Sequence, residues 1–313
     1  MMRYPKISII TPAYNESEII EKTMKHLVNE LKYPSRKKEI IIGIDGCTDN
    51  TLDIVKKFIK ENRKKCVIKI DCDGKRRGMA GRMMSMLKKA KGEIVLKMDA
   101  DMRLHSPGNV LYKIADAFKD PNVGGIVWFG EDFSKTLQAE RSFIARGEIF
   151  ANMLVSEFRK QFYPLTTIPP VPTLSVQCFR RKLINPNIDA SKIICMDDEI
   201  GYMILKKKYK IIYLGDVSVY FYGVPITVQQ LFYQKRRGIS GWFKLSEKYD
   251  IRVIGYYSRI FYFFLKNISK YKIEDIISFF YWCVIFTFAM IDAKIKKNYS
   301  VTKIWVKTPR KLK

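Results

Sequence analysis

Short apolar runs alternate with stretches of helical periodicity through about the first 130 residues. The apolar runs predict strands at 6–11, 39–45, 66–71, 93–98 and 123–129. The periodic stretches between them predict helices at 17–31, 50–62, 79–90 and 107–119. Strands that alternate with helices form a mainly parallel sheet covered by helices on both faces. We therefore expect an α/β fold of the Rossmann-like kind.

Polar clusters follow the first, second and fourth of these strands. They occupy residues 12–16, 45–49 and 99–101. Open α/β sheets bind their ligands outside the carboxyl ends of the strands, and parallel strands bring those ends to one edge. We therefore expect the three clusters to converge on a single site.

Further helices and strands follow the predicted sheet. The pattern predicts a helical stretch over 131–160, a rigid proline-rich loop at 168–172, a strand at 174–179, a helix at 197–207 and a strand at 210–214. The first 225 residues are therefore expected to form one α/β domain.

The C-terminal part of the chain is more apolar and more basic. Residues 276–291 form a sixteen-residue run in which only Ser278 and Thr287 are polar. A membrane-spanning helix needs about 20 such residues, so this run falls just short. Aromatic residues precede it at 253–265, and the tail 294–313 carries eight Lys or Arg and no acid. These features suit a membrane interface with anionic head groups.

We therefore expect residues 226–313 to be a helical, membrane-associated extension. The alternatives are a buried helical hairpin and a true membrane span. The expected location is the cytoplasmic face of the cell membrane, either peripheral or with one C-terminal membrane helix. The first apolar run, residues 7–10, is too short for a signal peptide.

The charge of the chain is strongly positive. The 313 residues include 57 Lys and Arg against 31 Asp and Glu, a formal net charge of +26. This excess predicts a polyanionic partner: nucleic acid, an acidic membrane surface or a phosphate-rich substrate. A compositional bias toward surface lysine is the alternative. Six scattered cysteines without a Cys-x-x-Cys pair, and only two histidines, argue against a zinc site and favour free thiols.

Two carboxylates, Asp99 and Asp101, stand one residue apart after an apolar strand. Hard oxygen ligands of this kind suit Mg²⁺ or Mn²⁺, which bind one or two carboxylates together with substrate phosphates. An ordinary loop after a strand is the alternative. The pair therefore predicts a divalent-cation site in a nucleotide-dependent enzyme.

Two strand-to-helix turns could hold a nucleotide base. In the first, Tyr14 and Glu16 would contact the base, and the alternative is a helix N-cap formed by Asn15. In the second, Asp45 would accept a hydrogen bond from the base, while Gly46 permits a tight turn. Turn chemistry alone is the alternative there.

Three further clusters carry charge at predicted helices. Residues 75–82 place four cations around two glycines at a helix start, which favours phosphate binding over a solvated basic loop. Residues 196–199 place three carboxylates at another helix start, which predicts a general base or simply a favourable dipole interaction. Residues 234–238 place basic side chains on a helix, where phosphate binding competes with a membrane-facing patch.

Taken in order, these motifs resemble the family 2 glycosyltransferases, which have the GT-A fold. Residues 9–16 look like the family's opening motif, and 45–49 resemble its Asp-Gly-Ser-Thr-Asp turn with Cys in the Ser place. Residues 92–101 look like its metal-binding strand. Residues 197–201, followed by 208–211, resemble its catalytic-base helix and the next strand. The resemblance covers roughly residues 6–240.

The chain departs from the family pattern at two places. Gln234 and Arg237 resemble the Gln-x-x-Arg-Trp motif of membrane polysaccharide synthases, but Gly238 stands where Trp is expected. Trp242 is close enough in sequence to substitute for it. The segment 77–84 lacks the Ala-Leu-Asn ending that is usual in the family.

The resemblance implies inverting transfer of a sugar from a nucleotide-diphosphate sugar, with UDP preferred and GDP open, to a saccharide or lipid-linked acceptor. It implies Mn²⁺ or Mg²⁺ as the cofactor. The sites that it implies are a nucleotide site (Pro12, Tyr14, Glu16, Asp45, Arg77, Asp99), a metal site (Asp99, Asp101, with Asp101 the more direct ligand), a base (Asp197, with Asp198 second) and a diphosphate and acceptor site (Gln234, Arg237, Trp242).

Two other functions remain open at this point. A polyprenyl-phosphate sugar transferase would use the same site with a lipid phosphate acceptor, although such relatives lack the Gln-x-x-Arg segment. A basic nucleic-acid-binding protein would use the positive charge and 18 Tyr as a phosphate track with stacking rings. The second leaves the ordered acidic clusters unexplained, so we expect no nucleic-acid partner.

Overall fold

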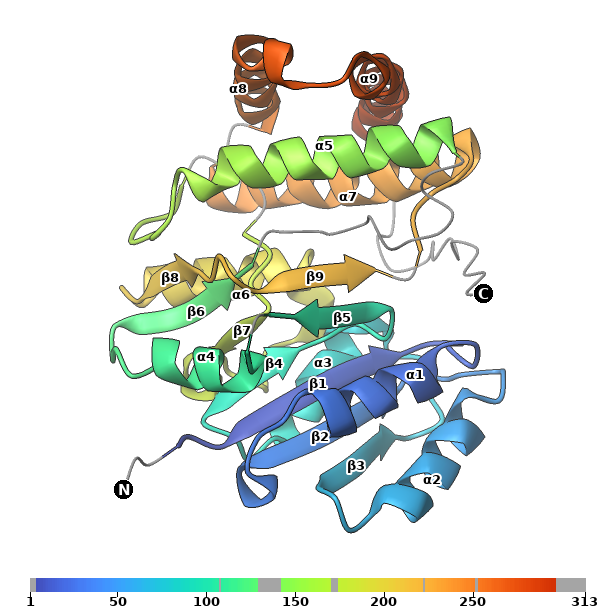
Figure 1. The fold of residues 1–313 in the computed structure, drawn as a ribbon, viewed down its shortest axis with the longest axis vertical. Coiled ribbons are helices and arrows are strands. Elements are labelled where there is room, and N and C mark those ends of the chain that lie inside the picture. Colours follow the sequence, from blue (N-terminus) through green and yellow to red (C-terminus); the bar gives the residue numbers. More distant parts are fainter. Residues whose placement is uncertain are drawn as a thin grey trace. The chain divides into compact units, whose positions relative to one another are not determined.

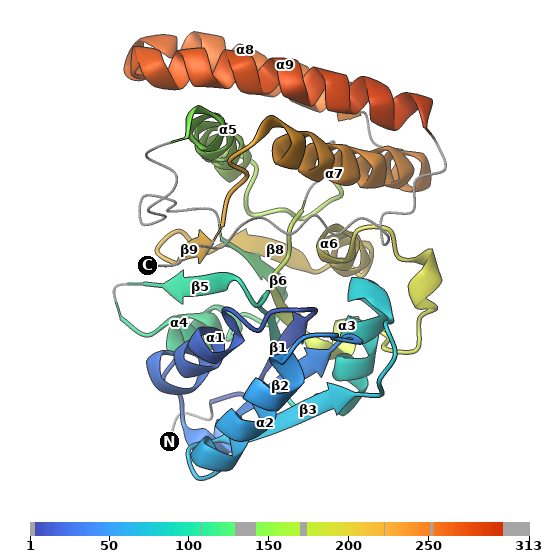
Figure 2. The same ribbon diagram turned by 90° about the vertical axis from the view of Figure 1, so that its right-hand side faces the viewer.

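A computed structural model describes residues 4–106, 108–128, 142–169, 174–221, 223–250 and 253–296. The chain divides into two compact units. The first comprises Met1–Trp128, Pro164–Ile168 and Leu174–Ser218, and the second comprises Phe129–Tyr163, Pro169–Thr173 and Val219–Lys313. Both are drawn in Figures 1 and 2.

The first unit is built on a seven-stranded sheet in the order β3-β2-β1-β4-β7-β6-β8. Its strands are β1 (Ile7–Ala13), β2 (Lys38–Ile44), β3 (Val67–Cys72), β4 (Ile94–Lys97), β6 (Val123–Val127), β7 (Cys178–Arg180) and β8 (Lys210–Tyr213). Only β7 runs antiparallel to its neighbours, β4 and β6. The predicted mainly parallel α/β sheet is therefore confirmed.

Helices cover both faces of this sheet. They are α1 (Ile20–Lys25), which continues as a π-helix over His26–Glu30, α2 (Thr51–Asn62), α3 (Gly78–Lys89), α4 (Val110–Ala117) and α6 (Met196–Lys206). Figure 2 shows α1, α2 and α4 on one face and α3 and α6 on the other. Every residue of β1, β2 and β4 is buried, which explains why these strands are recognisable as apolar runs.

Two details of the predicted sheet are wrong. The strand expected at 174–179 is limited to β7, because the backbone N–H groups of Leu174 and Ser175 donate to the Asp198 carboxylate instead of to a strand. A short strand, β5 (Met102–His105), follows the acidic turn after β4 and was not expected. A last strand, β9 (Ser218–Phe221), lies where the chain passes from the first unit to the second.

The histidine at the end of α1 is buried and neutral. The Nδ1 atom of His26 lies 2.7 Å from Glu30 Oε2, and its Nε2 atom accepts a hydrogen bond from the backbone N–H of Leu104 at 3.2 Å. Burial lowers the pKa of His26 below its usual value, although the Glu30 carboxylate acts in the opposite direction. Protonation of His26 would also remove the bond from Leu104.

This geometry predicts that the first unit loses stability in mild acid. Below about pH 6.5 the unfolded chain binds a proton at His26 more readily than the folded chain does. The free energy of unfolding therefore decreases as the pH is lowered. Replacement of His26 by Gln should make the melting temperature less dependent on pH between about pH 7 and pH 5. His105→Gln, at an exposed position, is the control and should keep the wild-type slope. An unchanged slope in His26→Gln would contradict the prediction.

The second unit is helical. It contains α5 (Phe143–Lys160), α7 (Val228–Tyr249), α8 (Val253–Lys266) and α9 (Ile273–Ile295). Helices α5 and α9 approach closely at Gly147, where a Cβ atom would lie 2.6 Å from the carbonyl oxygen of Ser278. Residues 131–141 of the predicted helical stretch and residues 170–172 of the proline-rich loop lie outside the described residues.

Helix α5 groups with the C-terminal helices, although its sequence position lies within the predicted 1–225 domain. The division into a catalytic domain (1–225) and a membrane-associated region (226–313) stays a prediction. The apolar run 276–291 lies inside α9, whose 23 residues make it the only described helix long and apolar enough to cross a membrane. Length and composition alone are weak evidence that it does so.

Candidate functional site

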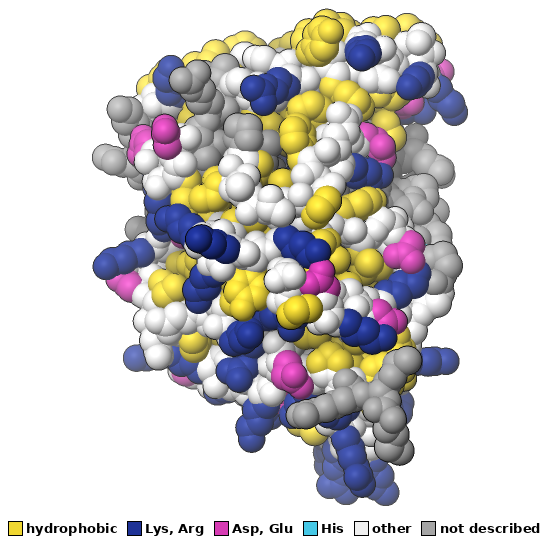
Figure 3. Space-filling view, turned by 90° about the vertical axis from the view of Figure 1, so that its left-hand side faces the viewer, with side chains coloured by type: hydrophobic (Ala, Val, Ile, Leu, Met, Phe, Trp, Pro, Cys, Tyr) yellow, Lys and Arg dark blue, Asp and Glu magenta, His cyan; other side chains and the backbone are white. Residues whose placement is uncertain are grey.

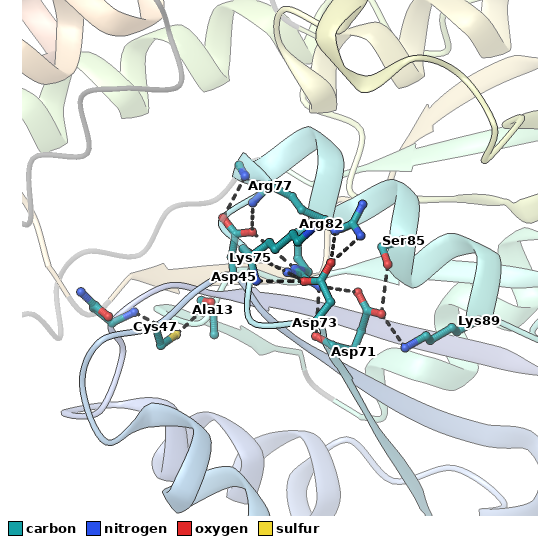
Figure 4. A network of polar contacts seen from close by, with 12 residues as sticks. Ala13, Asp45, Cys47, Asp71, Asp73, Lys75, Arg77, Arg82, Ser85 and Lys89 are labelled. Atoms are coloured by element: carbon teal, nitrogen blue, oxygen red, sulfur yellow. Dashed lines mark hydrogen bonds and ion pairs between the residues drawn. The ribbon is translucent and has the colours of Figure 1, made fainter.

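The carboxyl ends of β1, β2 and β4 lie side by side, because these three strands are adjacent and parallel. The acidic residue after β2, Asp45, is buried, and its backbone N–H donates to Ala13 at the end of β1. Its carboxylate accepts hydrogen bonds from the backbone N–H groups of Arg77 (2.7 Å) and Gly78 (3.0 Å), where α3 begins. Asp45 therefore ties the second strand end to the start of α3 (Figure 4).

A buried arginine organises the loop before α3. The Arg82 guanidinium lies 3.4 Å from Asp45, 3.1 Å from Asp71 and 2.7 Å from Asp73, and it also donates to the carbonyl of Lys75. Figure 4 shows these acidic residues around it. The sequence placed Arg82 among cations that could bind phosphate. That role is wrong for Arg82, because its side chain is fully buried and paired inside the protein.

The two other arginines of this loop are closer to the surface. Arg77 donates through Nε to Asp73 at 2.6 Å, and the Arg76 guanidinium lies 3.6 Å above the ring of Tyr14. The loop comes close to the second strand end because Gly46 has a φ of +65°, and a Cβ there would lie 2.8 Å from the Arg76 nitrogen. The loop before α3 therefore contacts both Tyr14 and the turn that contains Asp45.

The first loop is tied to the second through Asn15. Its side chain accepts a hydrogen bond from the Thr48 backbone N–H at 2.8 Å and contacts the Thr48 hydroxyl at 3.1 Å. The alternative of an Asn15 N-cap is wrong, because α1 begins only at Ile20. Glu16 is buried, and its backbone N–H donates to Thr51 at 2.8 Å. Pro12 is buried within β1.

The acidic turn after β4 contains the side chains predicted to hold a cation. Asp99 and Asp101 are both partly buried and lie in the turn between β4 and β5. The last residue of β4 is Lys97, whose side chain is almost fully buried. Its Nζ atom lies 3.1 and 3.3 Å from the two carboxylate oxygens of Asp99.

Lys97 also reaches the predicted catalytic base. Its Nζ atom lies 2.8 and 2.9 Å from the carboxylate oxygens of Asp197, at the start of α6. Burial alone would lower the pKa of Lys97, but Asp197 and Asp99 raise it above the usual value, so Lys97 is charged. Burial raises the pKa of Asp197; the Asp99 carboxylate acts in the same direction and Lys97 opposes both.

Sequence reasoning missed Lys97. Lys97 was counted only as part of the apolar run 93–98, and no role was predicted for it. The available signal was its place: two residues before Asp99, on the same side of an otherwise apolar strand. Asp197, one hundred residues away in sequence, could not be assigned to it without the fold.

The two neighbours of Asp197 have other contacts. Asp198 is buried and accepts hydrogen bonds from the backbone N–H groups of Leu174 (2.8 Å) and Ser175 (2.9 Å). Glu199 is also buried and accepts one from Ile194 at 2.6 Å. Of the three carboxylates at the start of α6, Asp197 is the one that faces Lys97 and Asp99.

The acidic turn offers hard oxygen ligands to a divalent cation. No group of three or more His, Cys, Asp or Glu side chains is placed for metal binding within the described residues. The protein can therefore supply two carboxylates, which suits Mg²⁺ or Mn²⁺ completed by phosphate oxygens and water. Asp99 Oδ1 pairs with Lys97 and, among the described groups, accepts no hydrogen bond. The donor set therefore fits such a cation, with Asp99 and Asp101 as the two carboxylates.

The remaining predicted site residues lie on α7 in the second unit. Gln234 carries a buried side-chain oxygen that accepts no hydrogen bond from the described residues, and Arg237 is partly buried. Trp242 lies one turn further on. A Cβ at Gly238 would be 3.8 Å from its indole ring, so Trp242 covers the position where the family pattern has Trp.

Comparison with known proteins identifies the family. Residues 8–184, more than half of the chain, match the sequence description of Glycosyl transferase family 2. The chain belongs to this family. The predicted resemblance is thereby confirmed.

Two curated proteins are similar in sequence to this family 2 chain. "Probable glycosyltransferase YdaM" of Bacillus subtilis is 28% identical over 171 residues, which is 54% of this chain and 40% of the relative. "Poly-beta-1,6-N-acetyl-D-glucosamine synthase" of Staphylococcus epidermidis is 34% identical over 120 residues, 38% of this chain and 27% of the relative. The matched segment thus spans less than half the length of these relatives.

Solved structures confirm the GT-A fold of the family 2 chain. A mannosyltransferase from Pyrobaculum calidifontis superimposes with a TM-score of 0.61 at 18% identity, over 94% of this chain and 87% of that one. S. aureus TarS 1-349 gives a TM-score of 0.51 at 19% identity, over 93% and 88%. At these identities the likeness concerns the fold.

Proposed function

We propose that the protein is an inverting glycosyltransferase that moves a sugar from a nucleotide-diphosphate sugar to an acceptor hydroxyl. One observation carries this proposal. The fold brings Asp197, the only carboxylate of its cluster turned toward the acidic turn, to the same lysine that holds Asp99. A base for the acceptor and carboxylates for the donor's cation thereby share one edge of the sheet.

In the proposed reaction, Tyr14, Glu16 and Asp45 receive the nucleotide base. Asp45 is already bonded to the start of α3, so its contribution is a fixed loop as well as a hydrogen-bond acceptor. The backbone N–H groups of Arg77 and Gly78 are used by Asp45, and the exposed Arg77 side chain would exchange its pairing with Asp73 for the diphosphate. Pro12 lies in the strand end below this loop.

Asp101 and Asp99 would hold the cation, and a cation bound there would neutralise the negative charge that grows on the leaving diphosphate. Asp197 removes the proton from the acceptor hydroxyl as the oxygen attacks the anomeric carbon. Lys97 holds the Asp197 carboxylate in place through two contacts shorter than 3 Å. The family resemblance further assigns Gln234 and Arg237 to the diphosphate and Trp242 to the acceptor.

The donor proposed is a UDP-sugar with Mn²⁺ or Mg²⁺, and GDP is the alternative. The mannosyltransferase described above was solved with GDP-Man and Mn²⁺, and TarS 1-349 was solved with UDP. The synthase among the relatives is named for a polysaccharide of N-acetylglucosamine. We therefore propose a saccharide or lipid-linked acceptor, at the cytoplasmic face of a membrane.

The test is release of free nucleotide by the purified full chain. The protein is incubated with a panel of UDP- and GDP-sugars, with Mn²⁺, with Mg²⁺ and with EDTA, and free UDP or GDP is measured. We expect release from one donor class that depends on the divalent cation. UDP plus Mn²⁺ should also raise the melting temperature, whereas oligonucleotides should not. No release from any donor and no stabilisation by either nucleotide would overturn the proposal.

A further inference from the structure

Helix α9 has two apolar faces, and only one of them is covered within the helical unit. Its inner face is buried against α5 and α7, and it consists of Ser278, Phe279, Trp282, Ile285, Phe286, Ala289 and Ala293. The opposite face is exposed, and it consists of Ile273, Ile277, Phe280, Tyr281, Val284, Phe288, Ile291 and Ile295. The exposed residues recur every three or four positions, so they form one continuous stripe along the helix.

The neighbouring helix extends this exposed surface. Phe261, Tyr262 and Leu265 of α8 are exposed, and the Phe261 and Phe280 rings lie 6.4 Å apart. An apolar cavity of about 260 Å³ lies between α5, α8 and α9 and is bordered by Phe261. We call the exposed residues of α8 and α9 together the apolar face. An area of this kind on one side of a protein marks an interaction surface.

The inner face of α9 carries polar contacts that do not suit a helix surrounded by lipid. The Trp282 indole donates to the buried Glu148 of α5 at 2.7 Å, and the same carboxylate pairs with Lys235 of α7 at 2.6 Å. Near the C-terminal end of α9, Asp292 pairs with the buried Arg236 of α7. A span would bring these charges into hydrocarbon or separate them, and both are costly.

Basic side chains lie on α8 and toward both ends of α9. From residue 253 to residue 296 the chain has six Lys or Arg against three Asp or Glu. The six cations (Arg259, Lys266, Lys270, Lys272, Lys294, Lys296) are all exposed. Figure 3 shows hydrophobic side chains gathered at the top of the view, over these helices, with Lys and Arg among them. We call these six cations the basic rim. An apolar surface with exposed cations on the same helices matches a bilayer with anionic head groups.

We propose that the apolar face docks in the plane of an anionic lipid bilayer, with α9 lying along the surface instead of crossing it. The stripe enters the boundary between head groups and acyl chains, the basic rim contacts the lipid phosphates, and the inner face stays packed on α5 and α7. This deepens the membrane location proposed above, while its test does not depend on any sugar transfer.

The test is co-sedimentation of the full chain with lipid vesicles. Wild type should bind phosphatidylcholine vesicles that contain phosphatidylglycerol, bind pure phosphatidylcholine less, and bind less as salt is added. Val284→Glu should weaken binding about tenfold or more, because it places a charge where an apolar side chain enters the lipid. Val284 is 53% exposed, so this variant should fold, which circular dichroism and melting temperature would verify.

The matched control is Val67→Glu. Val67 is also an exposed valine, at 49%, but it lies on β3 in the first unit. The Val67→Glu variant should bind vesicles as wild type does.

Extraction with alkaline carbonate distinguishes the two orientations of α9. Carbonate should release wild type from the vesicles if α9 lies in the plane of the bilayer, whereas a spanning helix would resist extraction.

Three results would overturn the inference. The first is equal binding by wild type and Val284→Glu. The second is resistance to carbonate. The third is absence of vesicle binding together with a dimer, seen by light scattering, that Val284→Glu dissociates; the apolar face would then contact a second copy of the chain. Nucleotide release can succeed or fail independently of all three.

Discussion

Replacement of Asp197 by Asn is expected to lower the rate of sugar transfer by roughly 10²–10⁴-fold, the usual contribution of a general base. Asn keeps the size and one oxygen of the side chain but cannot take a proton from the acceptor hydroxyl. Because Asp197 is assigned to the acceptor, and Lys97 still holds Asp99 when Asp197 is replaced, the binding of UDP with Mn²⁺ should be unchanged. Initial rates and calorimetric titration of UDP would separate the two effects.

Asp53→Asn is a suitable control, because the Asp53 side chain is 80% exposed on α2. It should transfer sugar at the wild-type rate. Asp198→Ala should behave differently from both. It removes the acceptor of the Leu174 and Ser175 N–H groups, so its main effect should be a lower melting temperature. An Asp197→Asn variant that transfers sugar at the normal rate would refute the assignment of the base.

Replacement of Lys97 by Met should have the second large effect. Met has a similar length but no charge, so Asp99 and Asp197 would face each other without the cation between them. Breaking a buried ion pair typically costs 3–5 kcal/mol, and we expect the lower end, about 3 kcal/mol, because both carboxylates retain partial contact with water. The free energy of unfolding in urea measures this loss.

A double-mutant cycle shows whether the loss comes from the pair. In the Asp197→Asn background one of the two charges is already absent, so Lys97→Met should cost clearly less than it does in wild type. Lys97→Arg keeps the charge and should restore part of the stability. If Lys97→Met cost the same in both backgrounds, the ion pair with Asp197 would not be the reason for the burial of Lys97.

These two predictions also separate folding from chemistry. Asp197→Asn should reduce kcat strongly and cost less stability than Lys97→Met, because Lys97 keeps Asp99 as a partner. Lys97→Met should reduce both, because the same side chain fills a buried position and holds the base. Recovery of stability without recovery of kcat in Lys97→Arg would show that the position of Asp197, and not only its charge, matters for transfer.

The sequence by itself determined the sheet and the edge at which the site lies. Alternating apolar and periodic segments are local signals, and a parallel arrangement leaves the ends of β1, β2 and β4 no other place than one edge. For that reason the acidic and polar turns at Asp45 and Asp99 could be assigned to a common site, and the order of the motifs was enough to predict the family.

Only the tertiary structure decided which side chains meet across that edge. The sequence ranked Asp197 before its neighbour Asp198 as the base by resemblance alone, and the fold separates them by turning one to Lys97 and the other to the backbone of residues 174–175. The same holds for α9, whose run of apolar residues does not say which face will be covered. Such contacts join residues far apart in the chain, so they depend on how the elements pack, and no local pattern of hydrophobic and polar positions contains them.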